Sequence, residues 1–310
     1  MSNAAATTAR AVTTSTLATG KSKDRNPASL VFLGALWFSL FFGIVVLIAL
    51  IIDTAISGAP RFDAHLFTNY TQTFAPEQAE RLAASGRDPE ILSAEYSGFK
   101  SGIIGSIILM ISVAIVSIPL GVASAVYLEE FASKKSRFGK IVEINLQNLA
   151  AVPAVIYGML AVGLMAAIGV QRGVALGGTV ALALLILPVI IITTREALRS
   201  VPDEIRQGSL ALGATVWQTT WRQVLPAAIP GISTGTILGL SRAIGEAAPL
   251  VMLGLGAINF APQFPFVDSK IEAFPLEIYD ASSSALEIVR QSASAGIIVL
   301  LTLILAMNAV

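Results

Sequence analysis

The chain has 310 residues, of which 55% are hydrophobic and 13% are charged, and its mean hydropathy is +0.76. A soluble globular domain carries about 25% charged residues, so this composition excludes that class and predicts a protein embedded in a bilayer. The 20 basic and 20 acidic residues balance, so the net charge does not point to nucleic acid or to acidic partners, and no nucleic-acid partner is expected. The chain contains no cysteine, which excludes disulfides and cysteine metal sites.

Residues 1–28 are predicted to be a disordered basic tail, because this stretch is rich in Ala, Thr and Ser and shows no apolar periodicity. Residues 29–310 then form a single transmembrane domain. Within the tail, Ser15 to Ser22 is similar to a phosphate-binding P-loop, but the first glycine is missing and no strand precedes it. The only histidine, His65, has no second histidine as a partner. We therefore predict no nucleotide site and no metal site.

Six apolar runs are long enough to cross a bilayer, since about 20 residues of helix span roughly 30 Å of hydrocarbon. The predicted fold class is therefore an all-α integral membrane protein with about six transmembrane helices. The last run has no charged flank, so this span is expected to be short or clipped at its inner end. The runs are Leu30 to Ile56, Ser101 to Leu128, Ile141 to Val170, Val174 to Thr194, Ala227 to Ala257, and Ala295 to Val310.

The distribution of basic residues predicts the orientation. The tail, the segment from Glu129 to Lys140 and the polar stretch from Arg195 to Pro226 each hold four Lys or Arg residues. Cytoplasmic segments are enriched in these residues, and an even number of crossings places all three on one face. We therefore predict six spans with a cytoplasmic N-terminus. The external loops are then about 57–100 and 258–293, and acidic residues outnumber basic ones in both.

The polar stretch from Arg195 to Pro226 begins with the pattern of a short helix. Pro202 is suited to a first helical position, and Asp203 and Glu204 complement the positive helix N-terminus. Gly213 is suited to the exit of this helix, which would have about ten residues and a length of roughly 15 Å.

A second short helix is predicted directly after the first. Thr215 is placed to cap it, and Trp217, Trp221 and Val224 are predicted to share one of its faces. The stretch as a whole fits two interpretations. One is an amphipathic helix on the membrane surface with aromatic anchors, and the other is a docking element for a second protein.

The span from Ala227 to Ala257 carries a stripe of small residues that predicts close helix packing. The stripe consists of Gly231, Gly235, Gly239, Ala243 and Ala247, which recur every four residues.

The same span carries two charges. Arg242 is 16 residues beyond Pro226, so it is predicted to lie about 24 Å along the helix, inside or just beyond the middle of the hydrocarbon. A charged side chain at that depth indicates function. Glu246 follows one turn later and is predicted to pair with Arg242, while Pro249 is predicted to break the helix beside them. The planar five-donor head of arginine favours an anionic substrate. The alternative is an inert ion pair that holds two helices in register.

The spacing of Gln207-Gly208-Ser209, Gly213 and Leu225-Pro226 resembles the Glu-Ala-Ala loop of binding-protein-dependent ABC importers. That loop reads Glu-Ala-Ala, three residues, Gly, nine residues, Ile, one residue, Leu-Pro. This sequence departs from it in the opening triplet and at Gln223, which replaces Ile. In the family the loop forms a coupling helix docked into a groove of the ATPase subunit. The resemblance implies the same role here, with Glu204 or Arg206 as the charged contact.

The segment from Ser241 to Pro249, SerArgAlaIleGlyGluAlaAlaPro, is similar to the signature of phosphate-specific importer permeases. Its Ala-Ala-Pro ending resembles the A-type subunit of that family more than the C-type subunit. Pro119 to Glu130 and Val152 to Met159 are similar to the second and third spans of the family. The resemblance covers roughly residues 101–310.

This resemblance implies that residues 29–310 are the permease domain of an ATP-driven importer of inorganic phosphate in the bacterial inner membrane. The implied partners are a C-type permease, an ATPase dimer and an external phosphate-binding protein. The chain would be no enzyme and would bind no cofactor, because ATP and Mg²⁺ would bind to the ATPase. The substrate pathway would include Ser241, Arg242 and Glu246.

Three alternatives remain open from the residues alone: an anion transporter or channel driven by ion gradients, a permease subunit for another oxyanion, and a scaffold or sensor subunit without transport.

Overall fold

The computed structural model describes residues 27–70, 81, 84–86, 88, 97–132, 137–171, 173–254 and 271–309. The chain divides into two compact units, Met1–Asp53 and Thr54–Val310. The helix α1 (Pro27–Gly58) supplies the described residues of the first unit and continues into the second. The predicted tail lies outside the described residues, apart from the first residues of α1.

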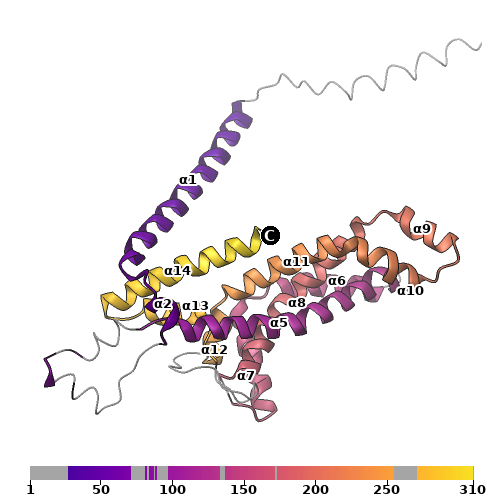
Figure 1. Ribbon diagram of the computed structural model, residues 1–310. Helices are drawn as coiled ribbons and strands as arrows, with labels where there is room; N and C mark the ends of the chain where they lie inside the picture. The colour runs from indigo at the N-terminus through magenta and orange to yellow at the C-terminus, as the bar shows by residue number, and fades with distance from the viewer. Residues whose placement is uncertain are drawn as a thin grey trace, which may run out of the picture. The chain divides into compact units, whose positions relative to one another are not determined.

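The second unit is built from helices (Figure 1). After η1 (Ala59–Arg61) and α2 (His65–Thr68), the long helix α5 (Lys100–Val126) continues into a π-helical turn, η2 (Tyr127–Phe131). The remaining elements are α6 (Arg137–Ala150), α7 (Ala154–Ala167), α8 (Ala175–Ser200), α9 (Asp203–Ala211), α10 (Val216–Thr219), η3 (Thr220–Val224), α11 (Leu225–Ile244), α12 (Ala248–Leu253), α13 (Phe274–Ser282) and α14 (Glu287–Asn308).

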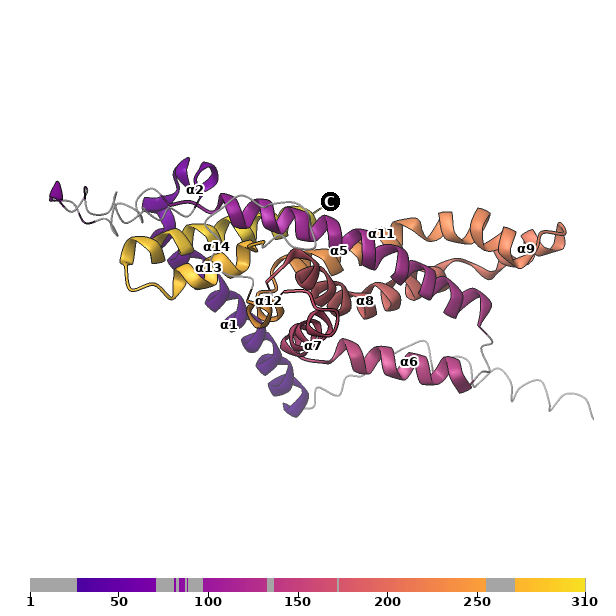
Figure 2. The same ribbon diagram turned by 90° about the horizontal axis from the view of Figure 1, so that it is seen from below.

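Helix α8 lies at the centre of the second unit, packed against both α5 and α11 (Figures 1 and 2). Its Ile186 and Ile190 are completely buried. Gly121 of α5 lies against Ile190, so the two helices come close together at a position where α5 has no side chain. The contact between α8 and α11 is described with the site below.

Five helices are long and apolar enough to cross a membrane, or six if one bent pair counts as a span. The bent pair corrects the prediction of a continuous span from Ile141 to Val170, because the chain turns by 102° between α6 and α7. Pro153 explains the break, since proline lacks a backbone N–H and disfavours helical geometry at the residue before it. Pro153 is the N-cap of α7.

The predicted break beside Pro249 is present. Helix α11 ends at Ile244, and α12 begins at Ala248 with Pro249 in its first turn. Gly158 of α7 lies against the backbone of Pro249, where a Cβ would come within 2.7 Å of the proline Cα. The missing side chain of Gly158 therefore allows α7 to pack on the broken segment.

The last helix and the second external loop differ from the prediction. Helix α14 has 22 residues and begins at Glu287, eight positions before the predicted span. The described part of the loop predicted at 258–293 contains α13, whose residues from Phe274 to Ile278 are buried. Hydrophobic periodicity cannot distinguish such a short buried helix from a loop, because only tertiary contacts bury it. Residues 274–278 are thus packed within the domain, whereas most residues from 279 to 287 are exposed.

Candidate functional site

The polar stretch after α8 folds into a helical hairpin, residues 203–224, which comprises α9, α10 and η3 (Figure 1). Pro202 is the N-cap of α9, one position earlier than expected, and Asp203 opens the helix. Gly213 adopts the left-handed conformation that ends the helical segment, with φ of +85°. Both termini of α9 therefore follow from local sequence chemistry.

The second half of the hairpin is fixed by a capping box. The Thr215 side chain accepts a hydrogen bond from the Gln218 N–H, and the Gln218 side chain accepts one from the Thr215 N–H. The hydroxyls of Ser209 and Thr219 lie 2.9 Å apart and join α9 to α10. The two short helices are thus held to one another.

The outer surface of the hairpin includes both polar and apolar groups. Glu204, Gln207 and Gly208 are exposed on α9. Leu212, at the turn after α9, is 91% exposed. Ile205 and Leu210 of α9 are also exposed, at 38% and 45%, so the hairpin offers several apolar side chains for contact with another molecule.

Trp217 and Trp221 stack with ring centroids 5.7 Å apart, and both are exposed. With Phe131 and Leu225 they line an apolar groove of about 710 Å³ beside α5. Val224 does not share this face, because it is fully buried against α8 and α11. The π-helical turn η3 inserts an extra residue per turn and so rotates Val224 away from the tryptophans.

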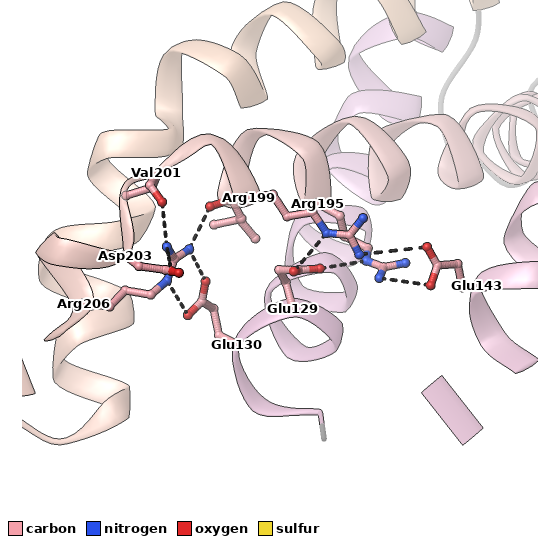
Figure 3. Close-up of polar contacts among 9 residues, drawn as sticks. Glu129, Glu130, Glu143, Arg195, Arg199, Val201, Asp203 and Arg206 are labelled. Carbon is pink, nitrogen blue, oxygen red and sulfur yellow. Dashed lines mark hydrogen bonds and ion pairs between the residues drawn. The ribbon is translucent and has the colours of Figure 1, made fainter. Parts of the chain in front are cut away.

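Two acidic residues in η2, directly after α5, bind arginines at the end of α8 and at the base of the hairpin (Figure 3). The Glu129 carboxylate accepts hydrogen bonds from Arg195 Nε at 3.3 Å and Arg199 Nε at 3.0 Å. Glu143 of α6 lies 3.7 Å from Arg195 and 3.9 Å from Arg199. The ends of α5, α6 and α8 are thereby joined in one ionic cluster.

Arg206 of α9 faces the second carboxylate, Glu130 (Figure 3). Its Nη2 and Nε donate hydrogen bonds to the Glu130 carboxylate at 2.9 and 3.4 Å. Its Nη1 donates to the Asp203 carboxylate at 3.2 Å. Nη2 and Nη1 also donate to the backbone carbonyls of Leu198 and Val201 respectively, both at 2.7 Å. These contacts use the five donors of a guanidinium group. The hydrogen bonds to Glu130 hold the pKa of Arg206 above its ordinary value, so the group stays charged.

The predicted pathway residues lie near the end of α11 and in the following break. Arg242 is exposed, and Glu246 is half-buried beyond the last residue of the helix. The predicted ion pair between them is not among the contacts of the described residues, because the helix ends at Ile244 and the spacing of a continuous turn is lost. Ser241 is buried and donates to Asn308 of α14 at 2.9 Å.

The small residues of α11 face α8. A Cβ at position 231 would come within 2.8 Å of the Ala197 Cβ, and one at position 239 within 3.6 Å of Ile190. Gly235, between them, lies against Thr193. Leu225 and Pro226 open α11, with Pro226 in its first turn. Gly231, Gly235 and Gly239 therefore bring α11, which follows the hairpin, onto the central helix.

The acidic anchors were missed as site residues from the sequence. Glu129 and Glu130 were recognised only as the end of a motif in the second span. The available signal was an acidic doublet at the end of an apolar run, in a chain whose polar stretch contains four arginines. That pattern shows that partners are needed but does not identify them, since Glu130 and Arg206 are 76 positions apart.

Chains of bacterial ABC transporters share this arrangement of long membrane helices with a helical hairpin between α8 and α11. A chain of a bacterial alginate ABC transporter shares the fold with a TM-score of 0.58 and 14% identity, covering 91% of this chain and 94% of that chain. A chain of the MetNI methionine ABC transporter shares it with a TM-score of 0.52 and 17% identity, covering 67% of this chain and 88% of that chain.

Residues 117–310 match the family described as the binding-protein-dependent transport system inner membrane component. This match covers more than half of the chain, and the protein belongs to that family. It is therefore a multi-pass membrane protein and a permease component.

Several relatives are phosphate transport system permease proteins named PstA. The chain is 37% identical over 193 residues to PstA of Mycobacterium leprae (strain TN), covering 61% of each protein. It is 27% identical over 278 residues to PstA of Haemophilus influenzae, covering 90% of each. The chain spans less than two thirds of the M. leprae protein and 45% of PstA 1 from Mycobacterium tuberculosis (strain H37Rv).

Proposed function

We propose that this chain is the A-type transmembrane subunit of an ATP-driven importer of inorganic phosphate. Membership of the permease family supports the class of transporter, and the names of the relatives support phosphate as the substrate. Its partners would be a second, C-type permease, an ATPase dimer and an external phosphate-binding protein. The chain would bind no cofactor, and the ATPase partner would bind and hydrolyse Mg-ATP.

One structural observation carries the coupling part of this proposal: a rigid hairpin presents the exposed helix α9 and the 91% exposed Leu212. An apolar side chain in this position loses contact with water when it enters a groove of a partner. Glu204, Gln207 and Gly208 lie exposed on the same helix and would complete the contact. Arg206 is engaged within the chain, so Glu204 is the better candidate for the charged contact. Because the ATPase is cytoplasmic, the hairpin would face the cytoplasm, and the N-terminus would do so too if the bent pair α6–α7 counts as one span.

The substrate part of the proposal places Arg242 on the phosphate pathway. Its side chain is exposed in the isolated chain and lies next to the break between α11 and α12. Interrupted helices in transporters line cavities where substrates bind. An arginine there would donate charge-assisted hydrogen bonds to a phosphate oxyanion. Glu246, in the break itself, would moderate the local positive charge so that the anion is released.

The proposal is tested by reconstituting the complex, with its binding protein, in lipid vesicles and measuring phosphate uptake. Uptake should require ATP on the side of the ATPase. Uptake that follows an imposed ion gradient without ATP would identify a secondary transporter instead. Uptake of sulfate but not phosphate would retain the ABC mechanism and contradict the substrate. Replacement of residues 208–213 by a flexible linker should release the ATPase while the chain stays in the membrane.

A further inference from the structure

Helix α9 has two covalent connections to the membrane helices. Val201 and Pro202 join it to α8, and the chain from Gly213 through α10 and η3 joins it to α11. The Glu130–Arg206 contact adds a third, non-covalent connection, to the end of α5. This contact links α9 itself to the end of α5 by hydrogen bonds, beside an apolar contact between Phe131 of η2 and Trp217 of α10.

The Glu130–Arg206 contact has the geometry of a rigid joint. The two Glu130 oxygens accept from two different nitrogens of one planar guanidinium, which fixes direction as well as distance. The same guanidinium binds the Leu198 and Val201 carbonyls at the end of α8. Exposed fractions of 9% for the Glu130 side chain and 19% for that of Arg206 limit competition from water.

The two neighbouring carboxylates of the π-helical turn η2 bind different helices. Glu129 binds Arg195 and Arg199, both on α8, whereas Glu130 binds Arg206 on α9. The end of α5 is therefore attached to the central helix by one carboxylate and to the hairpin by the other. Removal of Glu130 leaves the α5–α8 attachment in place, so the two attachments can be tested separately.

The opposite end of α5 is held equally firmly. Glu277 of α13 accepts hydrogen bonds from the Ser101 hydroxyl and the Gly102 N–H, both at 3.0 Å. Figures 1 and 2 place α13 and the hairpin at opposite ends of α5. The α5–η2 segment from Lys100 to Phe131 would measure about 48 Å as a helix. One continuous element thus connects the hairpin with the far side of the domain.

We infer that the Glu130–Arg206 bond is the joint through which movement of the hairpin is transmitted to α5 and along α5 to α13. Both are positioning residues, because they contact neither ATP nor the transported ion. This inference rests on the proposed function, in which the ATPase moves the hairpin. Without the joint, ATP hydrolysis would still displace the hairpin, but the displacement would reach the end of α5 only through apolar contacts, such as that between Phe131 and Trp217, which fix neither direction nor distance.

The first test measures phosphate imported per ATP hydrolysed in reconstituted vesicles. Arg206→Gln and Glu130→Gln should each lower this ratio about tenfold, the size of one lost charge-assisted hydrogen bond. Hydrolysis and co-purification of the ATPase should be retained. The double variant should be no worse than either single variant, and the exchange Glu130→Arg with Arg206→Glu should recover part of the ratio. Arg222→Gln, which removes an exposed arginine from η3, is the matched control and should leave the ratio unchanged.

An unchanged ratio in the single variants, effects that multiply in the double variant, or loss of the bound ATPase would each overturn the inference. If the complex transports another oxyanion, the proposal of phosphate as the substrate is wrong. The number of those ions imported per ATP hydrolysed then still tests the Glu130–Arg206 joint.

A second readout needs no transported ion. The natural chain lacks cysteine, so Tyr279→Cys provides a single site on α13 for a spin label. Its spectrum should change when ATP binds to the complex. Arg206→Gln should abolish that change, whereas Arg222→Gln should preserve it. A label that does not respond in the otherwise natural complex, or that responds equally in Arg206→Gln, would overturn the inference.

Discussion

Gly235 on α11 lies so close to Thr193 on α8 that a side-chain carbon at position 235 would overlap the threonine. Helix α11, which follows the hairpin, therefore packs tightly on α8 at Gly235, the middle of its three contacting glycines. Overpacking of such a contact typically costs about 1–3 kcal/mol. Gly235→Ala should lower the unfolding temperature of the purified chain in detergent.

The matched control for that prediction is Gly163→Ala on α7. Gly163 is exposed, and nothing lies within 4 Å of the position its Cβ would occupy. This variant should be as stable as the natural chain or slightly more stable, since alanine favours a helix by about 1 kcal/mol over glycine. Equal unfolding temperatures for the two variants would show that the α8–α11 contact is not tight.

Glu277→Gln tests the attachment of α13 to α5. The Glu277 side chain is buried and accepts hydrogen bonds from Ser101 and Gly102 at the first turn of α5. The amide cannot accept with both of its terminal groups, so one donor loses its partner, at a cost of about 1–3 kcal/mol. Thermal unfolding in detergent should show the loss, whereas Glu287→Gln, at an exposed site in the first turn of α14, should change stability by less than about 1 kcal/mol.

Leu212→Asp tests the docking surface of the hairpin. Burial of a leucine side chain in a partner groove contributes about 1.5–3 kcal/mol, so the affinity for the ATPase should fall at least about tenfold. The measurement is the dissociation constant of the purified ATPase for the chain in detergent. Leu212→Met, which keeps an apolar side chain of similar size, should bind almost normally. If Leu212→Asp binds as tightly as the natural chain, the tip of the hairpin is not part of the interface.

Arg242→Gln tests the substrate pathway. Loss of a charge-assisted hydrogen bond to phosphate should lower the initial rate of ATP-dependent uptake by about tenfold or more. Arg242→Lys keeps the charge without the planar fork and should give an intermediate rate. Both variants should retain the bound ATPase, because Arg242 lies near the end of α11 remote from the hairpin. Undiminished uptake by Arg242→Gln would remove this residue from the pathway.

Local sequence chemistry predicted the elements whose boundaries depend on nearby residues. The turn at Gly213, the cap at Thr215 and the break beside Pro249 all appear where they were expected, because φ preference, capping and a missing N–H act within one helical turn. The apolar runs likewise predicted the long helices, since the bilayer imposes length and composition on a span.

The same local reasoning failed where a tertiary contact overrides it. Periodicity predicted one span from Ile141 to Val170, but the chain bends by 102° there. It placed Val224 with the tryptophans, whereas η3 rotates this residue into the core. It paired Glu246 with Arg242, although α11 ends between them. In each case a small change in helix geometry moved a side chain to another face.

By itself, the sequence determined that this protein is a bundle of membrane helices interrupted by a polar helical hairpin, because hydropathy and capping are properties of neighbouring residues. Only the tertiary structure decided which charges meet. Glu130 binds Arg206 and Glu277 binds the start of α5, across 76 and 175 positions respectively. Such pairings depend on how the helices pack, and the order of charges along the chain does not show which of them lie close together in space.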